Sequence, residues 1–314
     1  MDPLSDVLAL LKPKSHITAG FDAGGSWCVR FDDQTGWIKC YTVESGGCWL
    51  SVEDCAEPTW IKGGDCFVLP SGRPFRLGSD LSAPSQTAGE VFAQARRREN
   101  GGGVAVLNGG GGVFLAGSRF AVEGRYAATL LRDLPPIIHL EAERDQAMLR
   151  WSIDQMMAEL RDDQPGASLA VQHLAHMMLL QALRLYLARS SAGGGGRQIG
   201  WFFALADPKI SAALVEIHAD PARRWTLEDL ASVAGQSRSL FARRFRERVG
   251  ETPIAYLTRW RMLLASERMT ATRESVGQTA RALGYESENA FNTAFKRVMG
   301  CPPRRFARGD AQAA

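Results

Sequence analysis

Two short segments, fifty residues apart, carry side chains that could bind the bases and phosphates of DNA. Arginine can donate two hydrogen bonds to guanine, asparagine can pair with adenine, and a positive charge neutralises phosphate. The candidate residues are Arg238, Ser239, Ala242, Arg243 and Arg246 in the first segment and Glu288, Asn289, Asn292, Thr293 and Lys296 in the second. Among them we expect Arg243 to contact guanine and Asn289 or Asn292 to contact adenine.

These side chains lie on two copies of one sequence pattern. The residues Ser237, Phe241, Phe245, Gly250 and Pro253 recur at the same spacing as Ser287, Phe291, Phe295, Gly300 and Pro303. In each copy the serine can cap the start of a helix, the phenylalanines share one face, and the glycine can end the helix in a left-handed conformation. Each copy is therefore predicted to be a helix that is anchored on its aromatic face and free on its polar face.

Another helix is predicted before each copy, and a tight turn separates the two. The first such helix runs from Thr226 to Ala234 and the second from Ser275 to Leu283. This order is the helix-turn-helix, in which the later helix enters the major groove. Pro253 can occupy the first turn of a connecting helix that ends near Met269. Its roughly 17 residues would span about 25 Å, which could hold the two recognition helices about one turn of DNA apart.

The charge distribution favours the same interpretation. Of the 314 residues, 37 are Lys or Arg and 34 are Asp or Glu, for a net charge of +3. Residues 198–314 hold 18 basic and 12 acidic residues, whereas residues 1–197 hold 19 and 22. A basic C-terminal third favours a nucleic-acid partner, because phosphate contacts need fixed positive charge. A helical scaffold that binds another protein is the alternative for this region.

The sequence from Ala280 to Pro303 resembles the signature of the AraC/XylS-type transcription regulators. It reads A-x-x-x-G-Y-x-S-x-x-x-F-x-x-x-F-K-x-x-x-G-x-P-P, and L-x-D-L-A-x-x-A-G at Leu227 to Gly235 looks like the first helix-turn-helix of that family. The resemblance covers about residues 207–308 and implies sequence-specific binding upstream of promoters, usually as an activator. Thr293 stands where many members have an arginine, and Thr279 occupies a usually aliphatic position. We therefore expect the second unit to contribute less base readout than the first.

The N-terminal region, residues 1–139, is predicted to be an all-β, cupin-like sensor domain. Short apolar strands separated by turn residues are typical of a barrel or sandwich. The expected strands are Trp27 to Phe31, Trp37 to Val43, Cys48 to Val52 and Cys66 to Leu69. The motifs at Asp2 to Leu8, Gly46 to Leu50 and Gly64 to Pro74 look like the cupin-type sensor of one AraC subgroup.

The remaining boundaries follow from helical periodicity and glycine content. Residues 140–196 are predicted to form two helices and a glycine linker, which could connect the domains or mediate dimerisation. Residues 197–314 are predicted to form an all-α domain with two helix-turn-helix units. The chain is thus expected to have a β-rich sensor, a helical connector and a helical DNA reader.

A cupin metalloenzyme is the rival class for the N-terminal domain. In the second cupin motif, which the resemblance places over Gly64 to Gly72, the metal-binding histidine falls at Phe75. Only His16 precedes His139, whereas a cupin metal centre normally needs two or three histidines. No nucleophile, base and orienting group form a catalytic set. We therefore predict a non-enzymatic protein without a metal or another cofactor.

Three hypotheses describe what the sensor could detect. A small organic effector could bind in the barrel among Trp27, Trp37, Tyr41 and Trp49. Oxidation could act on the cysteine cluster of Cys28, Cys40, Cys48, Cys55 and Cys66, since a thiol of lowered pKa can form a sulfenic acid or a disulfide. An anionic effector could bind Arg73, Arg76 or the run Arg96 to Arg98.

The sequence as a whole predicts a cytoplasmic, one-component transcription regulator. The chain opens with acidic residues where a secretory signal is basic, and no apolar stretch is long enough to span a membrane. The expected partners are double-stranded promoter DNA, RNA polymerase and an unknown small-molecule effector. Monomer and homodimer are both open alternatives, and no membrane partner is expected.

Overall fold

A computed structural model describes residues 2–11, 14–95, 104–121, 131, 134–141, 151–191 with gaps at 153, 157 and 160–163, 199–272 and 274–307. The chain forms two compact units. One is β-rich and comprises Lys12–Arg189, and the other is helical and comprises Met1–Leu11 together with Ser190–Ala314. None of the described helices has the length and apolar character that crossing a membrane requires.

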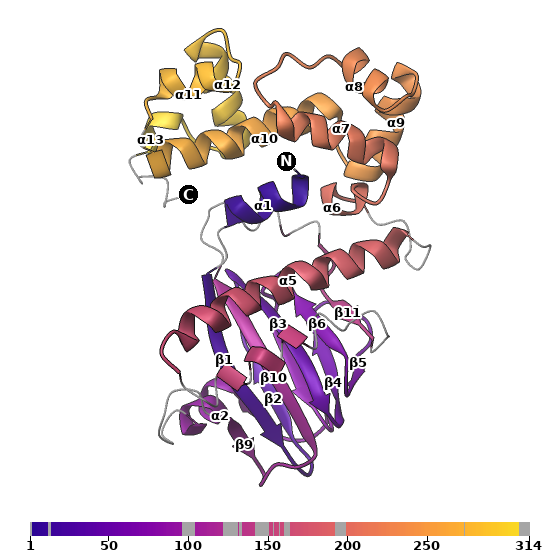
Figure 1. Cartoon of the computed structure of the whole chain (residues 1–314), viewed down its shortest axis with the longest axis vertical. Helices are drawn as coiled ribbons and strands as arrows, with labels where there is room; N and C mark the ends of the chain where they lie inside the picture. The colour runs from indigo at the N-terminus through magenta and orange to yellow at the C-terminus, as the bar shows by residue number, and fades with distance from the viewer. Residues whose placement is uncertain are drawn as a thin grey trace. The chain divides into compact units, whose positions relative to one another are not determined.

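The β-rich unit is built from two sheets (Figure 1). The strands are β1 (Lys14–Ala23), β2 (Cys28–Phe31), β3 (Trp37–Ser45), β4 (Gly47–Val52), β5 (Thr59–Lys62), β6 (Cys66–Leu69), β7 (Phe75–Gly78), β8 (Ser85–Thr87), β9 (Ala105–Leu107), β10 (Val113–Ala121) and β11 (Ile138–Leu140). One sheet has the order β11-β6-β3-β10-β1-β9 and the other β5-β4-β7-β2-β8. The four strands predicted from the sequence are confirmed, with ends that differ by at most two residues.

Alternation along β3 divides its side chains between two buried faces. Tyr41 and Val43 belong to the core between the sheets, whereas Ile38 and Cys40 are buried on the opposite face. Helix α5 (Ala167–Ser191) runs across that opposite face (Figure 1), where the rings of Phe120 and His176 lie 5.5 Å apart. A sheet that is covered on both faces explains why six consecutive residues of β3, from Ile38 to Val43, are all buried.

The prediction for the connector is tested only in part. Helix α5 corresponds to the second predicted helix of residues 140–196. Much of the first, including residues 142–150, and the glycine run at 193–196 lie outside the described residues.

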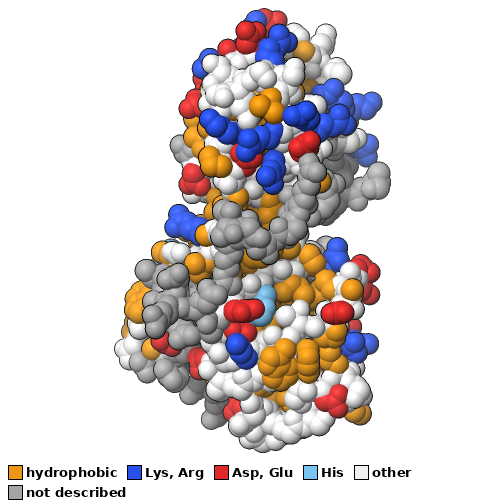
Figure 2. All heavy atoms as spheres, turned by 90° about the vertical axis from the view of Figure 1, so that its right-hand side faces the viewer, with side chains coloured by type: hydrophobic (Ala, Val, Ile, Leu, Met, Phe, Trp, Pro, Cys, Tyr) orange, Lys and Arg blue, Asp and Glu red, His pale blue; other side chains and the backbone are white. Residues whose placement is uncertain are grey.

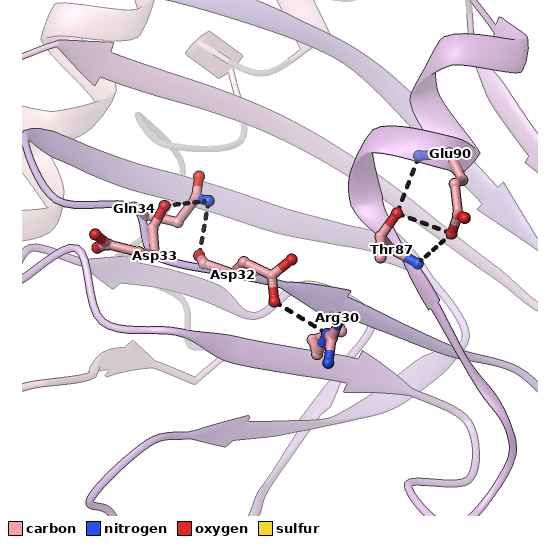
Figure 3. Close-up of polar contacts among 6 residues, drawn as sticks. All are labelled: Arg30, Asp32, Asp33, Gln34, Thr87 and Glu90. Carbon is pink, nitrogen blue, oxygen red and sulfur yellow. Dashed lines mark hydrogen bonds and ion pairs between the residues drawn. The ribbon is translucent and has the colours of Figure 1, made fainter.

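Figure 3 shows two groups of polar contacts, one in the turn after β2 and one at the start of helix α2 (Ala88–Ala95). Glu90 Oε2 accepts hydrogen bonds from the Thr87 backbone N–H at 2.9 Å and from its hydroxyl at 2.8 Å. Arg30 pairs with Asp32 at 3.0 Å, and the Gln34 amide donates to the carbonyl oxygen of Asp32 at 2.8 Å. Because each group is used by a neighbour in a turn or a cap, these contacts stabilise the local backbone.

The helical unit contains the C-terminal third of the chain and the first helix. Its elements are α1 (Pro3–Leu11), α6 (Trp201–Ala204), α7 (Pro208–Ala219), α8 (Leu227–Val233), α9 (Arg238–Val249), α10 (Pro253–Glu267), the π-helical turn Arg268–Thr272, α11 (Val276–Ala282), α12 (Glu288–Met299) and α13 (Pro303–Ala307). Helix α10 runs between the α8–α9 pair and the α11–α12 pair (Figure 1).

Helix α1 packs on this unit, although its sequence was expected to belong to the sensor at residues 1–139. Leu4 and Val7 are buried, and Asp6 Oδ2 lies 3.1 Å from Nδ1 of His218 on α7. Nε2 of His218 lies 2.7 Å from the Tyr256 hydroxyl of α10, and its ring stacks on Trp260 at 4.0 Å. Helix α1 therefore contributes to the core of the helical unit.

Candidate nucleic-acid interface

The two recognition helices begin and end as the sequence repeat predicts. Ser237 accepts a hydrogen bond from Leu240 N–H at the start of α9, and Ser287 accepts one from Ala290 N–H at the start of α12. Gly250 and Gly300 end these helices with φ angles of 91° and 76°. A non-glycine residue is disfavoured in this left-handed region, which explains the glycine in both copies.

The aromatic face of each recognition helix is fully buried. Phe241 and Phe245 of α9 pack with ring centroids 5.6 Å apart, and Phe291 and Phe295 of α12 lie at the same separation. Burying a phenylalanine side chain contributes about 1.5–3 kcal/mol relative to leaving it exposed. This anchoring holds the opposite face of each helix toward solvent.

The helices that precede the recognition helices carry matching N-terminal caps. Thr226 and Asp229 form a reciprocal capping box at α8, and Ser275 and Gln278 form one at α11. The predicted helix-turn-helix units are therefore both present, α8 with α9 and α11 with α12. Thr279, the polar residue at a usually aliphatic position, is fully buried, and its hydroxyl lies 3.4 Å from the Glu274 carboxylate.

Eight of the ten predicted DNA-contacting residues are exposed, and Ala242 and Asn292 are half-buried. The exposed ones are Arg238, Ser239, Arg243, Arg246, Glu288, Asn289, Thr293 and Lys296. Leu240, which the sequence analysis passed over as an apolar residue, is 40% exposed beside them. An exposed leucine one position from a buried phenylalanine could have been identified from the helical period, and its side chain suits a thymine methyl group.

The arginines of α9 fall into two groups according to their partners. Asp207, which is buried and caps α7, lies 2.7 Å from Arg244 and 3.5 Å from Arg248. Arg243 and Arg246 form no ion pair with any residue that the structure describes. Their charges are therefore available to an external anion, whereas Arg244 and Arg248 hold α9 to the start of α7. Figure 2 shows Lys and Arg side chains gathered on the helical unit.

The second recognition helix offers fewer positive charges to DNA. The Thr293 hydroxyl donates to the carbonyl oxygen of Asn289 at 2.9 Å, so its proton is used within the helix. Lys296 is exposed near the C-terminal end of α12, and Glu288 adds a negative charge at its start. This arrangement supports the expectation that the first unit dominates base readout.

Arg261 of α10 fixes the two helix-turn-helix units to each other. Its guanidinium donates to the carbonyl oxygens of Pro221 at 2.6 Å and Arg223 at 2.8 Å, in the segment that precedes α8. The same guanidinium lies over the ring of Tyr285, in the turn between α11 and α12, at 5.5 Å. Gly284 approaches this segment so closely that a Cβ atom there would clash with the carbonyl oxygen of Ala222. The spacing of the recognition helices is therefore set by side-chain contacts as well as by the length of α10.

The aromatic residues proposed for an effector pocket do not all meet. Tyr41 lines a small apolar cavity in the β-rich unit with Phe31, and Trp27 is buried beside Phe21 at 5.2 Å between ring centroids. Trp37 is half-buried under Arg119. The prediction for Trp49 is wrong. Its neighbours Cys48 and Leu50 face the core, so the period of the strand turns Trp49 outward, where it is 38% exposed and packs on Trp60.

The predicted cysteine cluster is divided by the fold, because Cys48 belongs to the core between the sheets whereas Cys40 and Cys66 are buried outside that core. Burial raises the pKa of Cys48 to about 12 and also raises the pKa of Cys28. The hydrogen bond with Cys66, whose sulfur lies 3.9 Å away, raises the pKa of Cys40 well above its ordinary value. Only Cys55 of the five is not buried. A raised pKa lowers the thiolate fraction on which oxidation depends.

The position of the cupin metal ligand is occupied by an apolar ring. Phe75 is buried and stacks on Phe31 with ring centroids 4.2 Å apart. Among the described residues, no group of three or more His, Cys, Asp or Glu side chains is placed to hold a metal ion.

Comparison with known proteins agrees with both halves of this description. A family model described as a cupin matches residues 2–188, and one described as a helix-turn-helix domain matches residues 230–309. AraC-like transcription regulators of Streptomyces lividans and Streptomyces antibioticus are 41% and 40% identical over 309 residues, which cover 98% of this chain and 98% and 99% of those proteins. The RCS-specific HTH-type transcriptional activator RclR of Escherichia coli (strain K12) is 29% identical over 98% of this chain and 97% of its own. The chain belongs to the family of AraC-like transcription regulators, with a cupin domain followed by a helix-turn-helix domain.

Proposed function

We propose that this regulator places α9 and α12 in neighbouring major grooves of a promoter-proximal site and activates transcription through RNA polymerase. The observation that carries the proposal is the duplicated helix-turn-helix with two arginines, Arg243 and Arg246, that have no counter-ion among the described residues. A relative named as an activator supports that direction of control. In this proposal the protein acts in the cytoplasm, without enzymatic activity, as a monomer or a homodimer.

DNA binding can be tested with fluorescence anisotropy on the DNA upstream of the protein's own gene, in the presence of random competitor. Arg243→Ala is expected to cost about 1–3 kcal/mol on the specific site and to relax selectivity at one base pair. Arg246→Ala is expected to weaken binding to all sequences alike and to reduce the salt slope by about one contact. Arg184→Ala, an exposed arginine of α5 in the β-rich unit, is the matched control. Equal losses on specific and random DNA for Arg243→Ala would contradict its assigned role.

The β-rich unit is proposed to bind a small organic effector between its sheets. The supporting observation is the cavity lined by Phe21, Val29, Phe31, Tyr41, Leu77, Phe92, Leu115 and Gly117. Its volume of about 10 Å³ is close to that of a single water site, so a larger effector must displace side chains as it enters. Such a change could alter the DNA affinity of the helix-turn-helix domain. An effector that shifts the operator affinity of wild-type protein but not of Tyr41→Ala would support this site.

Thiol oxidation is the second candidate signal, because the Cys40 and Cys66 sulfur atoms are only 3.9 Å apart. Their burial and the raised pKa of Cys40 weigh against it as a fast sensor. Mild oxidation that changes operator affinity in wild-type protein, but not in Cys40→Ser, would favour the redox signal over the organic effector.

A further inference from the structure

A buried lysine lies inside the β-rich unit without an acidic partner. Lys39 of β3 is only 6% exposed, and its ammonium nitrogen lies 4.5 Å from the ring centroid of Phe31 and 5.3 Å from that of Phe75. No described residue forms an ion pair or a hydrogen bond with it. Burial lowers the pKa of Lys39 to about 8, with a further contribution from Arg119, so the side chain is still mostly charged at pH 7. A buried charge that lacks a counter-ion is costly.

A second cation faces the same space. Arg119 of β10 is the direct cross-strand partner of Lys39, so both side chains project from the same face of the sheet. Like charges directly opposite each other on a sheet are destabilising. The Arg119 guanidinium lies 4.5 Å from the ring centroid of Trp37, and no described carboxylate pairs with it. The sheet therefore holds two adjacent positive charges with aromatic rings beside them and no anion among the described residues.

This pair of cations borders the apolar cavity. Two residues along each strand, Tyr41 and Gly117 form the next cross-strand pair on the same face, and both line the cavity. Phe31 connects the cavity with the cation site, since its ring lines the cavity and also contacts the Lys39 ammonium. A ligand with one negative end and one apolar end would thus meet matching chemistry over the distance of one step along the strand, about 7 Å.

We propose that Lys39 and Arg119 bind the carboxylate of a small organic acid whose aromatic or short alkyl body enters the cavity between Phe31 and Tyr41. The proposal rests on the proposed effector function of the barrel and names the chemical class of its ligand. A carboxylate can accept hydrogen bonds from an ammonium and a guanidinium at once, which satisfies both cations. The apolar lining disfavours a phosphate or another small inorganic anion, because nothing there would solvate its remaining oxygens.

The proposal can be tested on the full-length protein with benzoate, phenylacetate, hexanoate and octanoate, each compared with its neutral amide. Binding would be measured by isothermal titration calorimetry and by the shift in Tm. At least one acid is expected to bind at least tenfold more tightly than its amide, and Lys39→Met is expected to reduce that affinity about ten- to hundredfold. Lys62→Met, an exposed lysine of β5, is the control and should bind as wild type does.

A measurement without any ligand tests the same idea independently. If Lys39 is an unsatisfied charge kept for a ligand, Lys39→Met should raise the Tm of the free protein, because methionine fills similar space without a charge. A lower Tm for Lys39→Met would show that the cation–π contacts stabilise the fold, and it would overturn the proposal. So would acids and amides that bind equally, or no acid in the panel binding at all.

The experiments distinguish failure of the carboxylate site from failure of the effector function of the β-rich unit. If amides and acids bind equally and both change operator affinity in the anisotropy assay, the effector function stands and the anion site is refuted. If an acid binds through Lys39 but operator affinity does not change, the anion site stands and the effector function of the barrel is refuted.

Discussion

Acidification between pH 7 and pH 5 should destabilise the helical unit through one residue, His218. Burial lowers the pKa of His218 to about 3, against an ordinary value of 6.5. Asp6 and the Tyr256 hydroxyl, at 3.1 and 2.7 Å, match a neutral ring that donates from Nδ1 and accepts at Nε2. Below pH 6.5 the unfolded chain therefore binds a proton that the folded chain excludes.

The size and the sign of this effect follow from proton linkage. Each pH unit between the two pKa values costs about 1.4 kcal/mol of stability, and the loss increases as the pH falls. From pH 7 to pH 5 the expected loss is about 2 kcal/mol, a large part of the stability of a typical domain. The window lies above the ordinary pKa range of carboxylates, and the hydrogen bonds from Thr226 lower the pKa of Asp229 further.

Urea unfolding of wild type and His218→Gln at pH 7 and pH 5 measures the effect. The variant should be less stable at pH 7 but should lose about 2 kcal/mol less than wild type on acidification. His173→Gln, at an exposed position of α5, is the matched control and should keep the wild-type slope. In parallel, histidine ring NMR should show one ring that remains neutral at pH 5. A His218 ring that titrates near pH 6.5, with equal slopes for wild type and His218→Gln, would refute the reasoning.

Three further predictions concern the fold and its thiols. Gly284→Ala should destabilise the helical unit by more than about 1–2 kcal/mol in urea unfolding, because its φ is +77° and the new Cβ would meet the Ala222 carbonyl; unchanged stability would contradict the close contact. Phe291→Ala should cost about 3–5 kcal/mol and abolish specific DNA binding, whereas Ser287→Ala should cost about 1 kcal/mol. Iodoacetamide at pH 7.5 should label Cys55 before Cys40 and Cys48 by mass spectrometry, and faster labelling of Cys40 would contradict its raised pKa.

The helix-turn-helix repeat was predictable because its signals are local. Ser237 and Ser287 cap helices that start at the next residue, and Gly250 and Gly300 end them with left-handed backbone. Capping, the helical period and the glycine stop each depend on residues that are close together in the chain, so the helix boundaries can be identified from the sequence. The strands that begin at Trp37 and Cys66 could be predicted because each is a short apolar run that lies between turn residues.

The partners of the arginines on α9 were not predictable. Arg243, Arg244, Arg246 and Arg248 have the same chemistry, and only the fold places Asp207, some forty residues earlier, against two of them. The side of the strand that Trp49 occupies was missed because Trp49 is itself apolar and stands between the apolar Cys48 and Leu50, which hides the period of two at that point.

The sequence by itself determined the class of protein, the two recognition helices and the faces that they expose, since each depends on residues close together in the chain. Only the tertiary structure decided that α1 joins the helical unit through Asp6 and His218, 212 residues apart, and that Lys39 and Arg119 face each other in the barrel without a described counter-ion. Burial and pairing between distant residues depend on how the chain packs, and packing is a property of the whole fold.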